Sequence, residues 1–414
     1  MSETFVTGAA ESAGFDPRRL NRLAAFLDQQ LVSGKLPHAQ LLLSRDEQPV
    51  AFCTLGHARE DGTPLQEDAL FRIASMTKPI TSVAFMMLVE DGLVGLDTPV
   101  HRILPEFRDL AVRTGGGEDG EPFSTRPTEA PMRMIDLLRH SSGLTYSFQQ
   151  QSPIDAAYAA QKLDVFHQAR TSDEYIAALA ALPLEFSPGA GWNYSVSTDV
   201  LGIVVERLSG LSLADFFAER IFSPLAMTDT FFEVPPDHQP RLTDAWQADN
   251  SGTRTLYDRG QNSRWRLPPR SYSGGGGLVS STQDYHRFCR MLLRGGELDG
   301  TRLLSPKMVA LMTANHLPGG GDLAGISRSM FSESQNAGIG FGLGFAVTCD
   351  PVAAMLPGSI GEYYWGGMLS TFFFVDPVER IVAIFMTQVM PSTAISVRRE
   401  LKTLIYAALT ESRA

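Results

Sequence analysis

The chain has 414 residues, of which 43% are hydrophobic and 20% are charged, and this composition is typical of a globular protein with a sizeable core. A chain of this length exceeds the size of most single cores, so we expect two domains or one domain with a large insertion. A formal net charge of −11 argues against binding to nucleic acid, and charged residues interrupt the most apolar stretch, 369–386, which excludes a membrane-spanning helix there.

The first predicted element is an amphipathic helix over residues 16–33, where apolar residues recur at helical spacing before Gly34 ends the pattern. Two apolar runs of strand length follow at 38–44 and 50–55. The polar turn between these runs predicts a β-hairpin.

The middle of the chain predicts mainly helices. Helical spacing of apolar residues marks the segments 80–90, 134–139, 173–182, 198–208, 213–221, 282–293 and 306–313. Long stretches of low periodicity separate these helices, and we expect loops at 114–133, 146–172, 235–273 and 315–338.

The end of the chain predicts strands again, at 341–348, 369–375 and 381–387, followed by a helix over 395–409. Short turns between these strands favour antiparallel pairing. We therefore expect an α/β domain built from both termini, residues 1–72 and 336–414, which encloses a mostly helical domain over 73–335. The active site is expected where the two parts meet.

One short motif can carry chemistry. Ser75-Met76-Thr77-Lys78 is the only Ser-x-x-Lys in the chain, and it stands where a helical apolar pattern begins. Residues at i and i+3 share a helix face, so the Lys78 amine can lie beside the Ser75 hydroxyl. A lysine whose pKa is lowered can accept the serine proton and activate the hydroxyl as a nucleophile. In isolation, such a pattern is more often a helix-capping serine followed by a solvated lysine.

Further motifs follow Ser75 in a fixed order, and together they make the motif more informative. They are Leu137-Leu138-Arg139-His140-Ser141-Ser142-Gly143-Leu144, Phe186-Ser187-Pro188-Gly189 leading to Tyr194-Ser195, Gly276-Gly277-Leu278-Val279-Ser280-Ser281, and Tyr363-Tyr364-Trp365-Gly366-Gly367. This ordered set resembles the serine hydrolases related to class C β-lactamases. The resemblance implies an α/β fold like that of β-lactamases and penicillin-binding proteins, in which an antiparallel sheet with flanking terminal helices carries a mostly helical inserted domain.

The same resemblance assigns roles to residues of this chain. Tyr194 corresponds to the tyrosine of the family's Tyr-x-Asn motif, and Ser75, Lys78 and Tyr194 are the implied catalytic residues. Two other Tyr-Ser pairs, at 146–147 and 272–273, lack the surrounding family motif. The backbone N–H groups of Ser75 and Met368 are the implied oxyanion hole.

The chain departs from the β-lactamase pattern at two places. Val196 stands where the family has asparagine, and Trp365-Gly366-Gly367 stands where it has Lys-Thr-Gly. Valine donates no hydrogen bond and an indole carries no positive charge, so a substrate carboxylate beside Trp365 would lack a cation. Trp-Gly-Gly resembles the carboxylesterase branch of the family, family VIII. Here, Trp365, Gly366 and Gly367 are the expected substrate-binding residues, and we expect the glycines to let the substrate approach the strand.

The sequence therefore predicts a serine carboxylesterase that hydrolyses uncharged esters of short to medium chain length through an acyl-enzyme. Phe148 and Phe166 are candidates for the acyl pocket. Acyl transfer to an alcohol, cleavage of β-lactams or D-amino-acid peptides, and a non-catalytic sensor that is acylated without turnover stay open as alternatives.

The remaining expectations concern location and bound groups. Residues 1–12 have no basic segment followed by an apolar run, so no secretory signal is expected and the protein is predicted to be cytoplasmic. Cys53, Cys289 and Cys349 are too far apart for a disulfide framework or a metal pair. No motif implies a metal or a cofactor, and the expected partner is a small ester rather than a nucleic acid or a membrane. The sequence does not indicate the oligomeric state.

Overall fold

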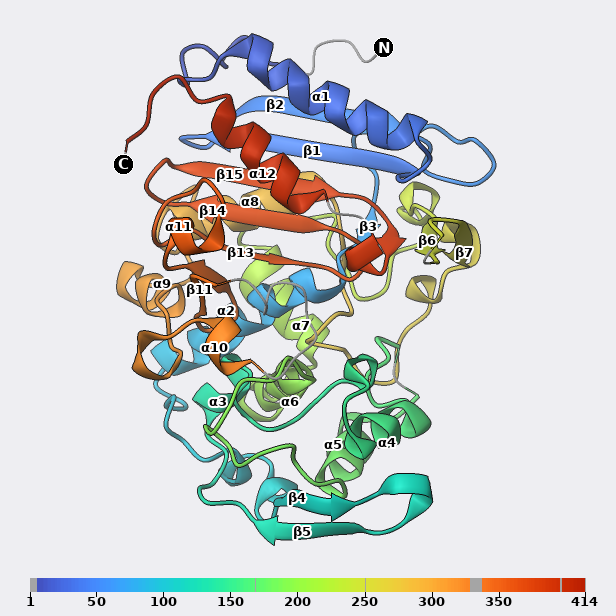
Figure 1. Ribbon diagram of the computed structural model, residues 1–414, viewed down its shortest axis with the longest axis vertical. Coiled ribbons are helices and arrows are strands. Elements are labelled where there is room, and N and C mark those ends of the chain that lie inside the picture. The colour runs from blue at the N-terminus through green and yellow to red at the C-terminus, as the bar shows by residue number, and fades with distance from the viewer. Residues whose placement is uncertain (1–5, 168, 250, 328–336, 395–396, 414) are drawn as a thin grey trace.

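The computed structural model describes residues 6–167, 169–249, 251–327, 337–394 and 397–413, and it is built around a seven-stranded antiparallel sheet (Figure 1). The strand order is β11-β12-β13-β14-β15-β1-β2, which confirms the antiparallel α/β class predicted from the sequence. The strands of this sheet are β1 (His38–Arg45), β2 (Gln48–Gly56), β11 (Ile339–Phe341), β12 (Ala346–Thr348), β13 (Tyr363–Gly366), β14 (Phe372–Asp376) and β15 (Ile381–Met386).

Helices cover both faces of the sheet, which explains why its central strands are almost entirely apolar. All residues of β14 and β15 are buried. Helices α1 (Pro17–Val32) and α12 (Arg398–Ala407) lie against each other in front of the sheet in Figure 1. Helix α8 (Thr282–Leu293) packs against β15, β1 and β14 from behind. Residues from the two ends of the chain thus share one core.

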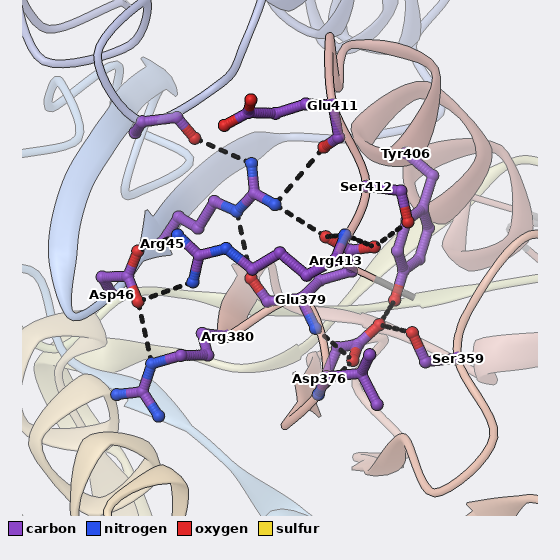
Figure 2. A network of polar contacts seen from close by, with 12 residues as sticks. Arg45, Asp46, Ser359, Asp376, Glu379, Arg380, Tyr406, Glu411, Ser412 and Arg413 are labelled. Carbon is purple, nitrogen blue, oxygen red and sulfur yellow. Dashed lines mark hydrogen bonds and ion pairs between the residues drawn. The ribbon is translucent and has the colours of Figure 1, made fainter.

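A buried polar network ties the two ends of the chain together (Figure 2). The Arg45 guanidinium on β1 donates to the Glu379 carboxylate between β14 and β15 at 2.7 Å, and the two side chains are 0% and 3% exposed. Arg45 also donates to the carbonyl oxygen of Ala13 at 2.9 Å. The backbone N–H of Arg413 donates to Glu379 at 3.0 Å. Because the pair is buried, removing one partner would leave an uncompensated charge inside the protein.

The other part of the structure is mostly helical, and its centre is α2 (Thr77–Glu90). Residues 77–88 of this helix are buried on every side, and α2 packs against α6 (Ser197–Ser209). The remaining helices are α3 (Met134–Leu138), α4 (Pro153–Gln161), α5 (Ser172–Ala180), α7 (Leu213–Phe217), α9 (Pro306–Met312), α10 (Leu323–Ile326) and α11 (Pro351–Ala354). The remaining strands are β3 (Phe71–Arg72), β4 (Ala111–Gly116), β5 (Phe123–Pro127), β6 (Ala245–Ala248), β7 (Arg254–Asp258), β8 (Val279–Ser280), β9 (Glu297–Leu298), β10 (Thr301–Arg302) and β16 (Val389–Met390).

Several segments differ from the sequence prediction. The expected strand over 341–348 is divided between β11 and β12, because the chain reverses at 342–345, where Gly344 has a φ of +99°. Strands β4 to β7 lie partly in segments predicted as loops. The residues of β5 and β7 are mostly exposed or half-buried, so these strands have no apolar alternation that a sequence pattern would detect. Helix α4 occupies part of the loop expected over 146–172.

Within the described residues, no helix combines the length and the apolar character needed to span a lipid bilayer.

Candidate active site

Ser75 lies in a tight turn that leads into α2. Residues Ala74–Met76 form a 3₁₀ turn, and the α-helix itself begins at Thr77 rather than at Ser75. Ala74 has a φ of +44°, in the left-handed region that a residue with a side chain rarely adopts. The turn is held in place from outside, since the N–H of Ile73 donates to the carbonyl oxygen of Leu278 at 3.0 Å. Such strain, fixed by its surroundings, is common at functional sites.

The Lys78 amine lies beside the Ser75 hydroxyl. Lys78 Nζ donates to Ser75 Oγ at 3.1 Å and to the carbonyl oxygen of Gly275 at 2.7 Å. The lysine is 1% exposed and Ser75 is 8% exposed. Burial lowers the pKa of Lys78 from 10.5 to about 7, although the Asp199 carboxylate opposes this shift. A buried amine of this pKa is neutral in a large fraction of molecules near neutral pH, so it can accept a proton from serine.

Asp199, in the first turn of α6, belongs to the same site and was not singled out from the sequence. Its carboxylate accepts hydrogen bonds from Ser273 Oγ at 2.5 Å and from the N–H of Gly275 at 3.1 Å. Burial raises the pKa of Asp199, and the nearby Lys78 lowers it. Asp199 therefore fixes the backbone at Gly275, whose carbonyl oxygen accepts the hydrogen bond from Lys78. An acidic residue in the first turn of a helix is ordinary, so no sequence signal marked this one.

Tyr194 also lies beside the Lys78 amine. Lys78 Nζ is 4.7 Å from the centre of the Tyr194 ring, and the tyrosine is buried. Gln149 Nε2 donates to the Tyr194 carbonyl oxygen at 3.0 Å and so helps to hold the loop before α6. The His140 ring packs edge-on against Tyr194 at 4.9 Å, and burial keeps the pKa of His140 well below its usual value, so this ring is neutral. The structure thus places both Ser75 and Tyr194 beside the Lys78 amine.

A second tyrosine also reaches the site. The Tyr146 ring centre is 5.3 Å from Lys78 Nζ and 5.2 Å from the centre of the Tyr194 ring. Phe148 stacks on Tyr146 at 5.1 Å and is 52% exposed, so it lies at the edge of the site. Phe166 instead packs against Gly276, the residue after Gly275. The sequence analysis assigned no role to the Tyr-Ser pair at 146–147 because it lacks the flanking motif, and only the fold brings Tyr146 to Lys78.

Strand β13 forms another wall of the site. Trp365 is buried, and its ring lies 5.4 Å from the rings of both Tyr194 and Phe341. A Cβ atom on Gly367 would come within 2.6 Å of the Ile73 carbonyl oxygen, so this glycine lets β13 approach the turn that carries Ser75. Met368 follows directly and its side chain is 37% exposed.

A cation lies beside this strand, where the sequence had suggested none. Arg398, the first residue of α12, donates through Nη2 to the carbonyl oxygens of Gly367 at 2.8 Å and Thr371 at 3.1 Å. A Cβ atom on Gly366 would lie 2.6 Å from Arg398 Cζ. The space that Gly366 leaves open is therefore filled by this guanidinium. Arg398 is a positive charge beside this strand that the sequence analysis did not identify, because it comes from a distant part of the chain.

In the ranges that the structure covers, no three histidine, cysteine, aspartate or glutamate side chains are grouped so that they could hold a metal ion.

The chain is similar to known proteins of one family. Residues 23–407 match the family model described as Beta-lactamase. The chain is 36% identical to protein Rv1367c of Mycobacterium tuberculosis, with 88% of each chain covered. It is 34% identical to esterase EstB of Burkholderia gladioli, with 88% of this chain and 89% of EstB covered.

A solved structure agrees with these relatives. EstCE1, described as a hydrolase with promiscuous acyltransferase activity, superposes with a TM-score of 0.78 at 25% identity, over 95% of this chain and 98% of that one. Relatives and structure neighbours that carry esterase or acyltransferase names support ester hydrolysis or acyl transfer on this fold. The chain therefore belongs to the beta-lactamase family of serine hydrolases, in its carboxylesterase branch.

Proposed function

We propose that the protein is a carboxylesterase that hydrolyses uncharged esters through an acyl-enzyme on Ser75. The observation that carries the proposal is the buried Lys78 amine, 3.1 Å from the Ser75 hydroxyl and with a pKa of about 7. A serine hydroxyl is a weak nucleophile until a neighbouring base removes its proton, and this amine is placed to do so.

In the first half of the reaction, Lys78 and Tyr194 together take the proton from Ser75. The serine oxygen then bonds to the ester carbonyl carbon, and the backbone N–H groups of Ser75 and Met368 bind the negative oxygen that forms. When this intermediate collapses, the bond between the carbonyl carbon and the alcohol oxygen breaks. Tyr194 returns a proton to the departing alcohol, and Lys78 re-protonates the tyrosine.

In the second half, a water molecule takes the place of the alcohol. The Lys78 and Tyr194 pair accepts a proton from water, and the hydroxide attacks the acyl carbon. The acid leaves as the bond to Ser75 breaks, and the serine regains its proton. Because the two groups lie close together, their protonation is coupled, and the pair rather than either residue acts as the base.

The aromatic walls of the site favour an apolar acyl group. Trp365 and Tyr146 are buried beside Tyr194, and Phe148 extends this surface toward solvent. Apolar walls with a few oriented polar groups are typical of sites for small neutral ligands. We propose Trp365, Gly366 and Gly367 as the strand along which the ester lies, and acyl groups of short to medium length as the preferred substrates.

A series of nitrophenyl esters with acetyl, butyryl, octanoyl and palmitoyl groups tests this proposal. The wild-type protein is expected to release nitrophenol fastest from the shorter esters, whereas Ser75→Ala and Lys78→Met are expected to retain less than about 1% of the rate. Faster cleavage of a chromogenic cephalosporin than of every ester would identify a β-lactamase instead. One equivalent of nitrophenol without turnover would identify a sensor.

Acyl transfer is the second candidate. The half-exposed aromatic ring of Phe148 beside the buried Tyr146 and Tyr194 rings offers an apolar surface on which an alcohol could replace water. The structural neighbour EstCE1 has both activities by its description. Product analysis with added butanol separates the two reactions, because transfer yields a butyl ester and hydrolysis yields only the free acid.

A further inference from the structure

We propose that Arg398 is a positioning residue of the oxyanion hole. It acts through the peptide that joins Gly367 to Met368, since it binds the carbonyl oxygen of this peptide and the N–H of the same peptide is the second oxyanion donor. The inference rests on the proposed function, in which the N–H of Met368 binds the negative oxygen.

The geometry of one peptide unit carries the argument. A peptide is planar, and in the trans form its C=O and N–H point in opposite directions. The Gly367 carbonyl oxygen accepts hydrogen bonds from Arg398 Nη2 at 2.8 Å and from the N–H of Ser370 at 3.0 Å. Fixing this oxygen fixes the plane of the peptide, and the direction of the Met368 N–H follows from the plane.

Arg398 holds both ends of the turn that contains this peptide. The same Nη2 atom donates to the Thr371 carbonyl oxygen at 3.1 Å, and this oxygen also accepts the N–H of Gly367 at 2.9 Å. The guanidinium therefore bridges the end of β13 and the start of β14. The turn between these strands carries Met368, so a movement of the guanidinium would move the N–H.

The charge of Arg398 adds to its geometric effect. A cation bound to a carbonyl oxygen draws electron density from the peptide and makes its N–H a stronger donor, as in cooperative hydrogen-bond chains. A positive charge behind the peptide also favours the negative charge that develops in front of it. Both effects are larger in the transition state, where the oxygen is negative, than in the neutral ester.

The position of Arg398 in its helix supports a function outside the helix. Arg398 is the first residue of α12, and the N-terminus of a helix disfavours positive charge. The guanidinium instead occupies the space left open by Gly366 and lies 5.7 Å from the centre of the Phe372 ring. The Trp365-Gly366-Gly367 sequence is thereby explained in a new way, because Gly366 makes room for the arginine and Gly367 for the turn that carries Ser75.

The chain offers a matched control for the experiment. Arg399 is the next residue of α12, and its guanidinium donates at 3.2 Å to the carbonyl oxygen of Ala354, on α11 and away from the Gly367 peptide. Arg398→Met and Arg399→Met each remove one positive charge and keep an apolar stem. Arg398→Lys retains the charge. Thermal unfolding of each variant shows that it is folded before its kinetics are measured.

The decisive measurement compares a nitrophenyl ester with its thionoester, in which sulfur replaces the carbonyl oxygen. Sulfur is a weaker hydrogen-bond acceptor, so the ratio of the two rates reports the contribution of the oxyanion hole. We expect Arg398→Met to lower kcat for the ester about 10- to 100-fold with little change in KM. This loss is smaller than the loss of kcat caused by removing an oxyanion-hole donor completely, because the Met368 N–H is misplaced rather than absent. The ester-to-thionoester ratio is expected to fall with it, to recover partly in Arg398→Lys, and to stay unchanged in Arg399→Met.

Two results would overturn the inference. An unchanged kcat in Arg398→Met, or a lower kcat with an unchanged ester-to-thionoester ratio, would show that Arg398 does not act on the oxyanion hole. Failure of the proposed function is distinct, because then the wild-type protein itself would not turn over esters. The variants are needed because only proline at position 368 would remove the backbone N–H, and proline would also fix the backbone of the turn.

Discussion

The pH dependence of ester hydrolysis follows from the state of one buried amine. Because the neutral form of Lys78 accepts the serine proton, activity requires that this amine has lost its own proton. Burial lowers the pKa of Lys78 to about 7. We therefore predict that kcat/KM falls as the pH decreases through about 7, and that it reaches a plateau above pH 8.

The size of the effect can be worked out from the lowered pKa. At pH 7.5, an amine with the ordinary pKa of 10.5 would be neutral in only about one molecule in a thousand, whereas one with a pKa of about 7 is neutral in about three quarters. The burial of Lys78 thus raises the population of the reactive form several hundredfold. Below the pKa, kcat/KM is expected to decrease about tenfold per pH unit, so at pH 5 about one hundredth of the activity remains.

The assay is the initial rate of nitrophenyl butyrate hydrolysis from pH 5 to 9, at substrate concentrations below KM. Asp199→Asn links the result to Lys78, since the Asp199 carboxylate raises the pKa of the amine. Removal of this charge is expected to move the lower limb of the profile to a more acidic pH. A limb that lies above pH 9 in the wild-type protein, or that moves toward alkaline pH in Asp199→Asn, would refute the reasoning.

Three further predictions concern Tyr194, Lys78 and the network in Figure 2. Tyr194→Phe is expected to lower kcat about 10²- to 10⁴-fold through loss of proton transfer, and Tyr146→Phe far less, as measured with the same ester. The pKa of Lys78 is lower in the folded than in the unfolded chain, so between pH 7 and 10.5 the unfolded chain binds the extra proton and stability rises with pH. Urea unfolding is expected to show this rise in the free energy of unfolding, which is at most about 1.4 kcal/mol per pH unit. The rise is expected to disappear in Lys78→Met. Arg45→Met is expected to destabilise the fold by about 3–5 kcal/mol in urea, because Glu379 is left buried and unpaired; a loss below about 1 kcal/mol would contradict this.

The parts of the site that could be predicted are those set by local spacing. Ser75 and Lys78 are three residues apart on one helical turn, so their contact needs no knowledge of the fold. The apolar runs of β1, β2 and β15 and the helical pattern of α1 likewise predicted their elements to within a few residues. Tyr194 was found through the motif around it rather than through its own chemistry.

The residues that were missed come together only in the folded chain. Asp199 reaches Lys78 through Gly275, which is 76 residues further along the sequence. Arg398 meets Gly367 because α12 packs against the sheet, and an arginine at the start of a helix carries no signal for this contact. Long-range contacts of this kind depend on how elements pack, and no periodicity or short motif encodes them.

The central claim is that Ser75 is the nucleophile, and labelling by a fluorophosphonate tests it most directly. Intact mass spectrometry is expected to show one adduct on the wild-type protein and none on Ser75→Ala. Ser82→Ala, which removes a buried hydroxyl elsewhere on α2, is expected to be labelled like the wild type. An adduct of the same mass and yield on Ser75→Ala would contradict the account.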